Sequence, residues 1–246
     1  MTRESSPNIA FPPTRWSLVL SSSSENKTAA LEELSRLYWS PLYVFCRRQG
    51  LPLEDAEDIT QRFFHDLVKS DAALLDEASP SGGRLRTLFL CILQRRIIDY
   101  HRHALREKRG GGSAFFSLDA ADAEQLITAS DPTASPEEAF DRQWALNVLE
   151  LALARQEKEF TASGRQQQFA ALAPFLGLTD TEPDYTIVEQ TLGISAATAR
   201  QTVLRFRDRF RRYLREEIAE TIAETDEQAI DRELAELQSI LRGAAR

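Results

Sequence analysis

Seven arginines follow a glycine turn in the stretch from Tyr185 to Arg215. A guanidinium group is always charged and can donate two parallel hydrogen bonds, so an arginine-rich helix suits DNA phosphates and the edge of guanine. Gly193 tolerates a left-handed turn, and Ser195 can cap the helix that follows. The pattern predicts a helix-turn-helix that binds DNA, with a solvated amphipathic helix of an all-α domain as the plainer alternative. The arginines are Arg200, Arg205, Arg207, Arg209, Arg211, Arg212 and Arg215.

A second cationic segment lies between residues 84 and 109. It holds eight Arg or Lys residues against Asp99 and Glu107, a balance of +6, while residues 196–215 hold seven Arg against Asp208, again +6. The whole chain carries −8, so the remaining residues together carry −20. Two basic segments in an otherwise acidic chain indicate local contact with a polyanion better than the net charge does.

The composition, with 42% hydrophobic and 28% charged residues among 246, is typical of a soluble globular protein. No apolar run approaches the roughly 18 residues that cross a bilayer, and no secretory signal is apparent, so we expect a cytoplasmic protein without membrane insertion. Cys46 and Cys91 lie in apolar helical patterns and are expected to be buried thiols. His101 and His103 have no Cys or acidic residue at ligand spacing, so we expect no metal and no cofactor.

These segments must lie on helices, because helical periodicity recurs along the chain and strand alternation is almost absent. We therefore predict an all-α protein. Ser135, Pro136 and Glu138 form a predicted capping box that begins a helix ending near Gly164. Pro41 is expected to kink or divide the first long helix. The other predicted helices cover residues 28–49, 53–69, 71–76, 84–108 and 165–176.

Two helical domains joined by a linker follow from this order, the second with the helix-turn-helix. The acidic tail carries −6 and an apolar stripe from Ile218 to Leu241. We expect it to pack on the helix-turn-helix domain or on the linker side of the N-terminal domain, and either to compete with DNA or only to stabilise the fold. The predicted parts are a disordered arm (1–13), an N-terminal helical domain (14–110), a linker (111–135), a C-terminal helix-turn-helix domain (136–215) and an acidic helical extension (216–246).

The order of the segments resembles an extracytoplasmic-function (ECF) sigma factor of bacterial RNA polymerase. An acidic amphipathic helix precedes a basic aromatic helix, a linker and a helix-turn-helix. The resemblance covers about residues 14–215, and the acidic extension resembles a subset of the family that has a C-terminal extension. The three strongest segments are Leu51–Val68, Arg84–Arg109 and Tyr185–Arg215.

The resemblance implies that the acidic helix docks on the clamp helices of core RNA polymerase. An acidic face beside aromatic surface would complement a basic coiled coil, with Phe64 as an anchor. The alternative is an ordinary surface helix with Phe63 and Phe64 in the core. Arg62 stands where the family usually has an acid. The residues that match the docking motif are Asp55, Glu57, Asp58, Gln61 and Phe64.

The basic helix matches the segment that opens the minus-10 promoter element. Single-strand capture needs a cationic track for phosphates and planar groups for unstacked bases. Arg95 stands where many relatives carry an Asn that reads a base. Six residues are expected to face the core: Leu85, Leu88, Phe89, Ile92, Ile97 and Ile98. Six others are expected to reach the DNA: Arg95, Arg96, Tyr100, His101, Arg102 and His103.

The helix-turn-helix matches the reader of the minus-35 element. Arg200 and Gln201 are the expected base readers, and Arg211 is expected to contact phosphate. The family positions at the start of the second helix are Ala196, Ala197, Thr198, Arg200, Gln201, Leu204 and Arg205.

Three classes of function remain open at this point. The favoured one is a sigma factor that binds core RNA polymerase and promoter DNA, with an anti-sigma or other regulatory protein as a further candidate partner. The second is a stand-alone helix-turn-helix regulator with an N-terminal sensor or dimerisation domain, which would have no need of residues 84–109 as a basic aromatic helix. An enzyme is the least favoured, because no nucleophile–base spacing or metal motif is present.

Overall fold

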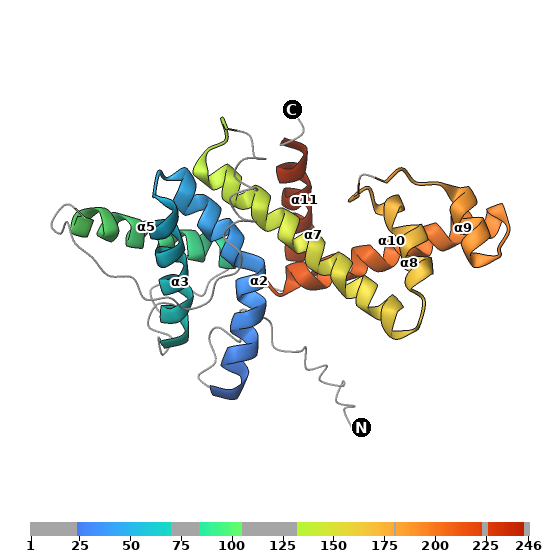
Figure 1. Ribbon diagram of the computed structural model, residues 1–246, viewed down its shortest axis with the longest axis horizontal. Helices are drawn as coiled ribbons and strands as arrows, with labels where there is room; N and C mark the ends of the chain where they lie inside the picture. Colours follow the sequence, from blue (N-terminus) through green and yellow to red (C-terminus); the bar gives the residue numbers. More distant parts are fainter. Residues whose placement is uncertain (1–23, 70–83, 105–131, 180, 223–225, 244–246) are drawn as a thin grey trace, which may run out of the picture.

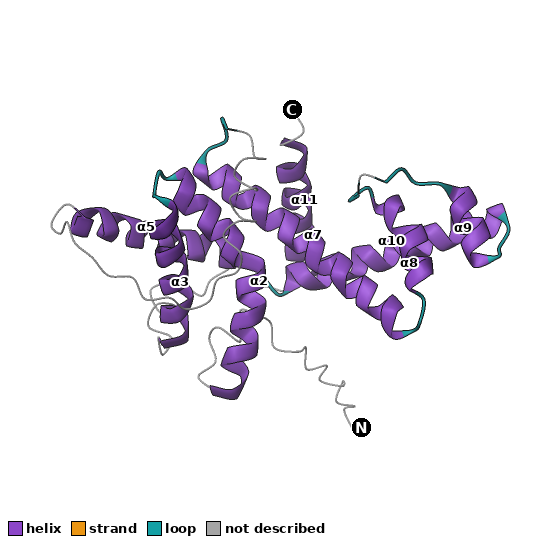
Figure 2. Ribbon diagram, in the orientation of Figure 1, coloured by secondary structure: helices purple, strands orange, loops and turns teal. Residues whose placement is uncertain are grey.

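The computed structural model describes residues 24–69, 84–104, 132–179, 181–222 and 226–243. Within these ranges the regular structure is helical and the only β contact is an isolated bridge between Arg84 and Ile222 (Figure 2). The predicted all-α class is therefore confirmed. The predicted N-terminal arm, the helix at 71–76 and most of the linker lie outside the described residues.

Three helices form the N-terminal part: α2 (Ser24–Arg48), α3 (Leu53–Lys69) and α5 (Leu85–Ala104). Phe89 of α5 meets Tyr38 of α2 and Phe63 of α3 edge-to-face, at centroid distances of 4.7 and 5.1 Å. We expected Pro41 to kink or divide this helix; α2 is continuous through Pro41, so the proline does not divide it. Leu37 and Leu42 are fully buried on either side of it, and this packing offsets the hydrogen bond that proline removes.

The long helix α7 (Pro136–Ala162) begins with the predicted capping box. The Ser135 hydroxyl accepts from the Glu138 amide at 3.1 Å, and the Glu138 carboxylate accepts from the Ser135 amide at 2.7 Å. Its first half packs against α2 through buried Phe140 and Trp144. Leu151, further along the helix, is only half-buried. The start of α7 therefore shares a core with the N-terminal helices, although the sequence placed it in the second domain.

The second half of α7 packs in a smaller core with the helix-turn-helix. Here α8 (Gln166–Leu172), η1 (Ala173–Leu176), α9 (Tyr185–Leu192) and α10 (Ala196–Ala219) follow one another. Phe160, Phe169 and Phe206 pack together at centroid distances of 5.6 to 5.9 Å. Gly193 ends α9 with a left-handed φ of 65°, and the Ser195 hydroxyl accepts from the Thr198 amide at 3.4 Å to cap α10. The predicted turn and cap are confirmed.

The last helix, α11 (Glu227–Gly243), returns against α7 and α10 near the middle of the molecule (Figure 1). α10 itself continues to Ala219, past the boundary expected at Arg215. Figure 1 shows α5 and the α9–α10 turn toward opposite ends of the long axis, with α7 spanning between them. The far ends of the two cationic helices are thus separated in space, and α11 lies near the middle, where their other ends approach each other.

Candidate nucleic-acid interface

The start of α10 presents an apolar face to the core and a different, mostly polar face to solvent. Ala199, Val203 and Phe206 are buried, because they recur at helical spacing against α7, α8 and α9. Leu204 is a large apolar side chain on the opposite side of the helix and is 57% exposed. The solvent-facing set includes every expected minus-35 position: Ala196, Ala197, Thr198, Arg200, Gln201, Leu204 and Arg205.

The arginines of α10 divide into two groups along the helix. Within the described part of the chain, no ion pair involves Arg200 or Arg205, and both are exposed near the Ser195 cap. The Arg207 guanidinium donates to the Phe175 carbonyl at 2.8 Å and so holds α10 on η1. The remaining four pair with carboxylates: Arg209 with Glu159, Arg211 with Asp208, Arg212 with Glu216, and Arg215 with Glu227 and Asp231.

The arginines that pair with carboxylates differ in how readily they can meet DNA. The pair of Arg211 and Asp208 is exposed on both sides and lies within one helix, so it contributes little and phosphate can replace it. The Glu159 carboxylate accepts from both Arg209 and Tyr213, which ties α7 to α10. The hydrogen bond from Tyr213 and the neighbouring arginines hold the pKa of Glu159 below its ordinary value.

The expected minus-10 residues on α5 also fall into two groups, one exposed and one held by contacts to α3. His101 and Arg102 are exposed, and Arg102 pairs with Asp99, one helical turn away, at 3.4 Å. Arg95 is exposed as well. His103 lies on α5, but its side chain lies outside the described residues.

Tyr100 and Arg96, in contrast, are held by α3. The Tyr100 phenol donates to the Asp55 carboxylate at 2.6 Å, and this hydrogen bond, with burial, raises the pKa of Tyr100 to about 12. Arg96 pairs with Asp66 at 2.9 Å and lies over the Phe63 ring at 5.7 Å. Two residues expected to meet DNA thus also join α5 to α3, a role that the sequence did not suggest.

Asp66 itself was not among the expected site residues. Burial would raise the pKa of its carboxyl, but hydrogen bonds from His65 and Arg96 and the charge of Arg96 hold it below the usual range. Its separation from Arg96 by 30 residues explains why periodicity could not reveal the pair. Only the packing of α3 against α5 brings the two together.

The expected docking residues lie together on α3 and are all half-buried: Asp55, Glu57, Asp58, Gln61 and Phe64. The two phenylalanines, left open by the sequence, have different environments. Phe63 is buried in the core, while Phe64 packs edge-to-face on it at 5.4 Å and keeps part of its ring exposed. Arg62 pairs with Asp58 at 3.2 Å and so neutralises part of the acidic face.

Two expectations for α5 were wrong. Ile98 is 51% exposed and not in the core, and Cys91 is exposed whereas Cys46 is buried as expected. The first half of α5 is apolar on nearly all sides, so its sequence does not identify the covered face. The position of α5 against α2 and α3 buries Ile97 and leaves Ile98, about 100° further around the helix, in solvent.

Two other kinds of site are absent from the described residues. In that part of the chain, no cluster of three or more His, Cys, Asp or Glu side chains could hold a metal ion. None of its helices combines the length and apolarity that a membrane span requires.

Comparison of the sequence with known protein families finds one match. The profile described as ECF sigma factor matches residues 80–217, which is more than half of the chain and includes α5, α7 and the helix-turn-helix. The matched segment does not include α3 or α11. No curated protein and no solved structure is significantly similar to the chain. The family is a regulatory, non-catalytic one that acts in transcription initiation. The matched segment carries both the basic helix α5 and the capped, solvent-facing start of α10, and on this evidence the chain belongs to the ECF sigma factor family.

Proposed function

We propose that the protein directs promoter-specific initiation by docking core RNA polymerase on α3, reading the minus-35 element with the start of α10 and opening the minus-10 element with α5. The observation that carries the proposal is the exposed face of α10 after the Gly193 turn, inside the family segment. Arg200 and Arg205 lie on this face with exposed guanidinium groups, which suits guanine edges and phosphates.

The docking assignment depends on α3, which the family segment does not cover. Its support is chemical: Glu57, Asp58 and Gln61 present a polar, acidic surface beside the exposed edge of Phe64. A basic helical partner would gain charge complementarity around an aromatic anchor.

The strand-opening assignment depends on α5. His101 and Arg102 offer a planar ring and a cation on its exposed side, next to the half-buried ring of Tyr100. Stacking and phosphate contact are what unpaired DNA requires. An anti-sigma protein that binds these faces is a further proposed partner.

Reconstituted transcription tests the proposal. Purified protein and core RNA polymerase should together give run-off transcripts from a subset of a promoter library, while neither does so alone. Asp58→Arg with Gln61→Ala should weaken core binding, because it reverses the charge of the proposed docking face. Glu157→Arg, an exposed charge reversal on α7, is the matched control and should bind core as the wild type does.

The outcome also separates the alternatives. Unchanged core affinity of the double variant would show that α3 is not the docking helix. Specific DNA binding without any association with core polymerase would instead identify the stand-alone regulator.

A further inference from the structure

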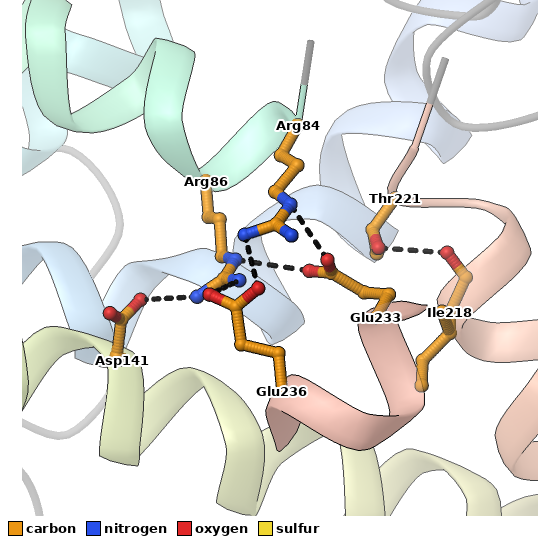
Figure 3. Close-up of polar contacts among 7 residues, drawn as sticks. All are labelled: Arg84, Arg86, Asp141, Ile218, Thr221, Glu233 and Glu236. Carbon is orange, nitrogen blue, oxygen red and sulfur yellow. Dashed lines mark hydrogen bonds and ion pairs between the residues drawn. The ribbon is translucent and has the colours of Figure 1, made fainter. Parts of the chain in front are cut away.

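The far end of α10 is fixed by polar contacts beside the start of α5 (Figure 3). Just beyond this end, the Thr221 carbonyl accepts a hydrogen bond from the Leu85 amide at 3.0 Å. Glu233 of α11 pairs nearby with Arg84 at 2.8 Å and with Arg86 at 3.0 Å. Hydrogen bonds and ion pairs depend on direction as well as distance, so this end of the helix has one defined position.

The reading end of α10, residues 196–205, is held in a different way. Its buried side chains are the apolar Ala199 and Val203. Within the part of the chain that the structure describes, no hydrogen bond or ion pair joins residues 196–205 to another helix. Burial of apolar surface has no preferred direction, so it holds the reading end in contact without selecting one orientation.

A small error at the far end of α10 becomes large at the reading end. At 1.5 Å per residue, Ala196 lies about 35 Å from Ala219, so a tilt of about 2° about Ala219 moves Ala196 by about 1 Å. A hydrogen bond from a guanidinium to a base tolerates roughly 0.5 Å in length. Accurate base reading by Arg200 therefore requires a fixed point closer to it.

Gln156 of α7 supplies such a point at the middle of α10. Its side-chain amide donates to the Phe206 carbonyl at 3.1 Å, and the residue is fully buried. Ala152, four residues earlier on α7, belongs to the large core, whereas Phe160, four residues later, belongs to the smaller core together with Phe206. The Gln156 amide thus contacts α10 at the boundary between the two cores.

The contact between Gln156 and Phe206 adds little to folding stability. No donor among the described residues reaches the Gln156 Oε1, so one hydrogen bond only partly offsets the cost of burying this amide. The Phe206 carbonyl lies inside α10, where the helix itself supplies a donor from four residues further on. A buried polar group with this balance is explained better by the orientation it selects than by the stability it adds.

Two other contacts hold the same segment of α10, but both are partly exposed. The Arg207 guanidinium donates to the Phe175 carbonyl at 2.8 Å, and Arg209 pairs with Glu159 at 2.8 Å. Water and salt weaken such contacts. The bond from Gln156 is shielded from water and is therefore stronger and more restrictive.

We propose that Gln156 is a positioning residue for promoter reading, which fixes the orientation of α10 so that Arg200 and its neighbours meet the minus-35 bases in one register. Because it is buried, Gln156 touches no DNA and acts through the backbone of Phe206. The inference rests on the proposed function, since it needs α10 to read base sequence. It names the residue that determines how sharply that sequence is read.

Gln156→Met tests the proposal in the full-length protein, because methionine is unbranched and similar in size to glutamine but has no donor. Gln143→Met is the matched control. Gln143 is a second buried glutamine of α7, about 20 Å along the helix from Gln156, and its amide donates to Asn147 at 2.9 Å.

Holoenzyme reconstituted with core RNA polymerase should select from promoters with a randomised minus-35 element. Gln156→Met should lower the ratio of preferred to random-sequence affinity by roughly 2- to 10-fold, the effect of one lost hydrogen bond, without lowering the melting temperature. Gln143→Met should leave the ratio unchanged. A residue that only stabilises the core would change the melting temperature and not the ratio.

The orientation of α10 can also be measured in the free protein without DNA. Spin labels on Ala154→Cys of α7 and Ala197→Cys of α10, both at exposed positions, report the distance between the helices by double electron–electron resonance. Cys91→Ser removes the exposed native thiol. The distance distribution should be narrow when Gln156 is present, broader or shifted in Gln156→Met and unchanged in Gln143→Met.

An unchanged preference ratio in Gln156→Met would overturn the proposal, and so would an unchanged distance distribution. Gln156→Leu provides the same tests should Gln156→Met fail to fold. Failure of both variants to fold would also contradict the proposal, because it requires the amide to be dispensable for folding. A wild-type holoenzyme without any minus-35 preference would instead refute the proposed function, and the distance distribution would then decide whether Gln156 orients α10.

Discussion

Tyr100 joins two roles that its substitutions can separate. Tyr100→Phe keeps the ring that could stack on an unpaired base but removes the phenol that donates to Asp55. Tyr100→Ala removes both. Comparing the two variants therefore distinguishes a ring that captures DNA from a hydrogen bond that only holds α5 on α3.

The structure sets the size of each effect. A hydrogen bond to a charged acceptor contributes about 1.5–3 kcal/mol, and because both side chains are half-exposed, screening reduces this to about 1 kcal/mol. Tyr100→Phe should thus lose about 1 kcal/mol of folding stability, and Asp55→Ala a similar amount. Stacking of one base on an aromatic ring contributes about 1–3 kcal/mol, so Tyr100→Ala should reduce the open fraction of the promoter by roughly 5- to 150-fold.

Permanganate footprinting of the melted region, together with thermal unfolding of each variant, measures both effects. Tyr100→Phe should open the promoter almost as well as the wild type, while Tyr100→Ala should form closed complexes normally and regain activity on a pre-melted bubble. Glu157→Ala, which removes an exposed carboxylate on α7 outside the proposed docking and DNA-contacting faces, is the control. If Tyr100→Ala opens the promoter normally, or if Tyr100→Phe fails as badly at equal stability, stacking on this ring is not the mechanism.

Other predictions concern DNA contacts, thiols and acid stability. Arg200→Ala should relax the preference at one base pair by about 1–3 kcal/mol, measured as the spread of affinities over promoter variants. Arg211→Ala should instead weaken binding to all promoter sequences evenly and reduce the salt slope of binding by about one. Equal effects of both variants would contradict the assignment of base reading to Arg200 and phosphate contact to Arg211. A thiol reagent should titrate Cys91 in the native protein and Cys46 only after unfolding, because burial raises the pKa of the Cys46 thiol to about 12; two fast thiols would refute this burial. The pKa of Asp66 lies below its unfolded value of 3.8, so its contribution to stability is present above that pH and is lost as the pH falls through the folded pKa. Asp66→Asn should therefore lower stability at neutral pH and flatten the acid limb of the unfolding curve, and an unchanged limb would show that the carboxylate is not paired.

Local chemistry could be predicted from the sequence because it depends on neighbours in the chain. The capping box at Ser135, the left-handed turn at Gly193 and the cap at Ser195 all form where the residue types require them. Each is satisfied within a few residues, so no distant contact was needed to infer it. The bounds of α3 agree with the prediction for the same reason, since one acidic and one apolar face recur at helical spacing.

The roles of individual charges could not be predicted in this way. Arg86 counted as one cation of a basic segment, yet it is buried between Glu233 and Asp141. Its hydrogen-bond partners are 147 and 55 residues away along the chain. A charge can be paired by any element that packs beside it, so composition gives the charge of a segment but not the part that remains available to DNA.

The sequence by itself determined the helical class, the helix-turn-helix and the positions that face solvent at the start of α10. These features depend on helical backbone geometry, which repeats every few residues and is determined by neighbours in the chain. Tertiary structure alone decided that Ile98 and Cys91 are exposed, that Tyr100 is tied to Asp55, and that the acidic tail fastens α10 to α5. Burial and ion pairing are properties of the surface that a helix meets, and that surface is formed only when distant segments pack together.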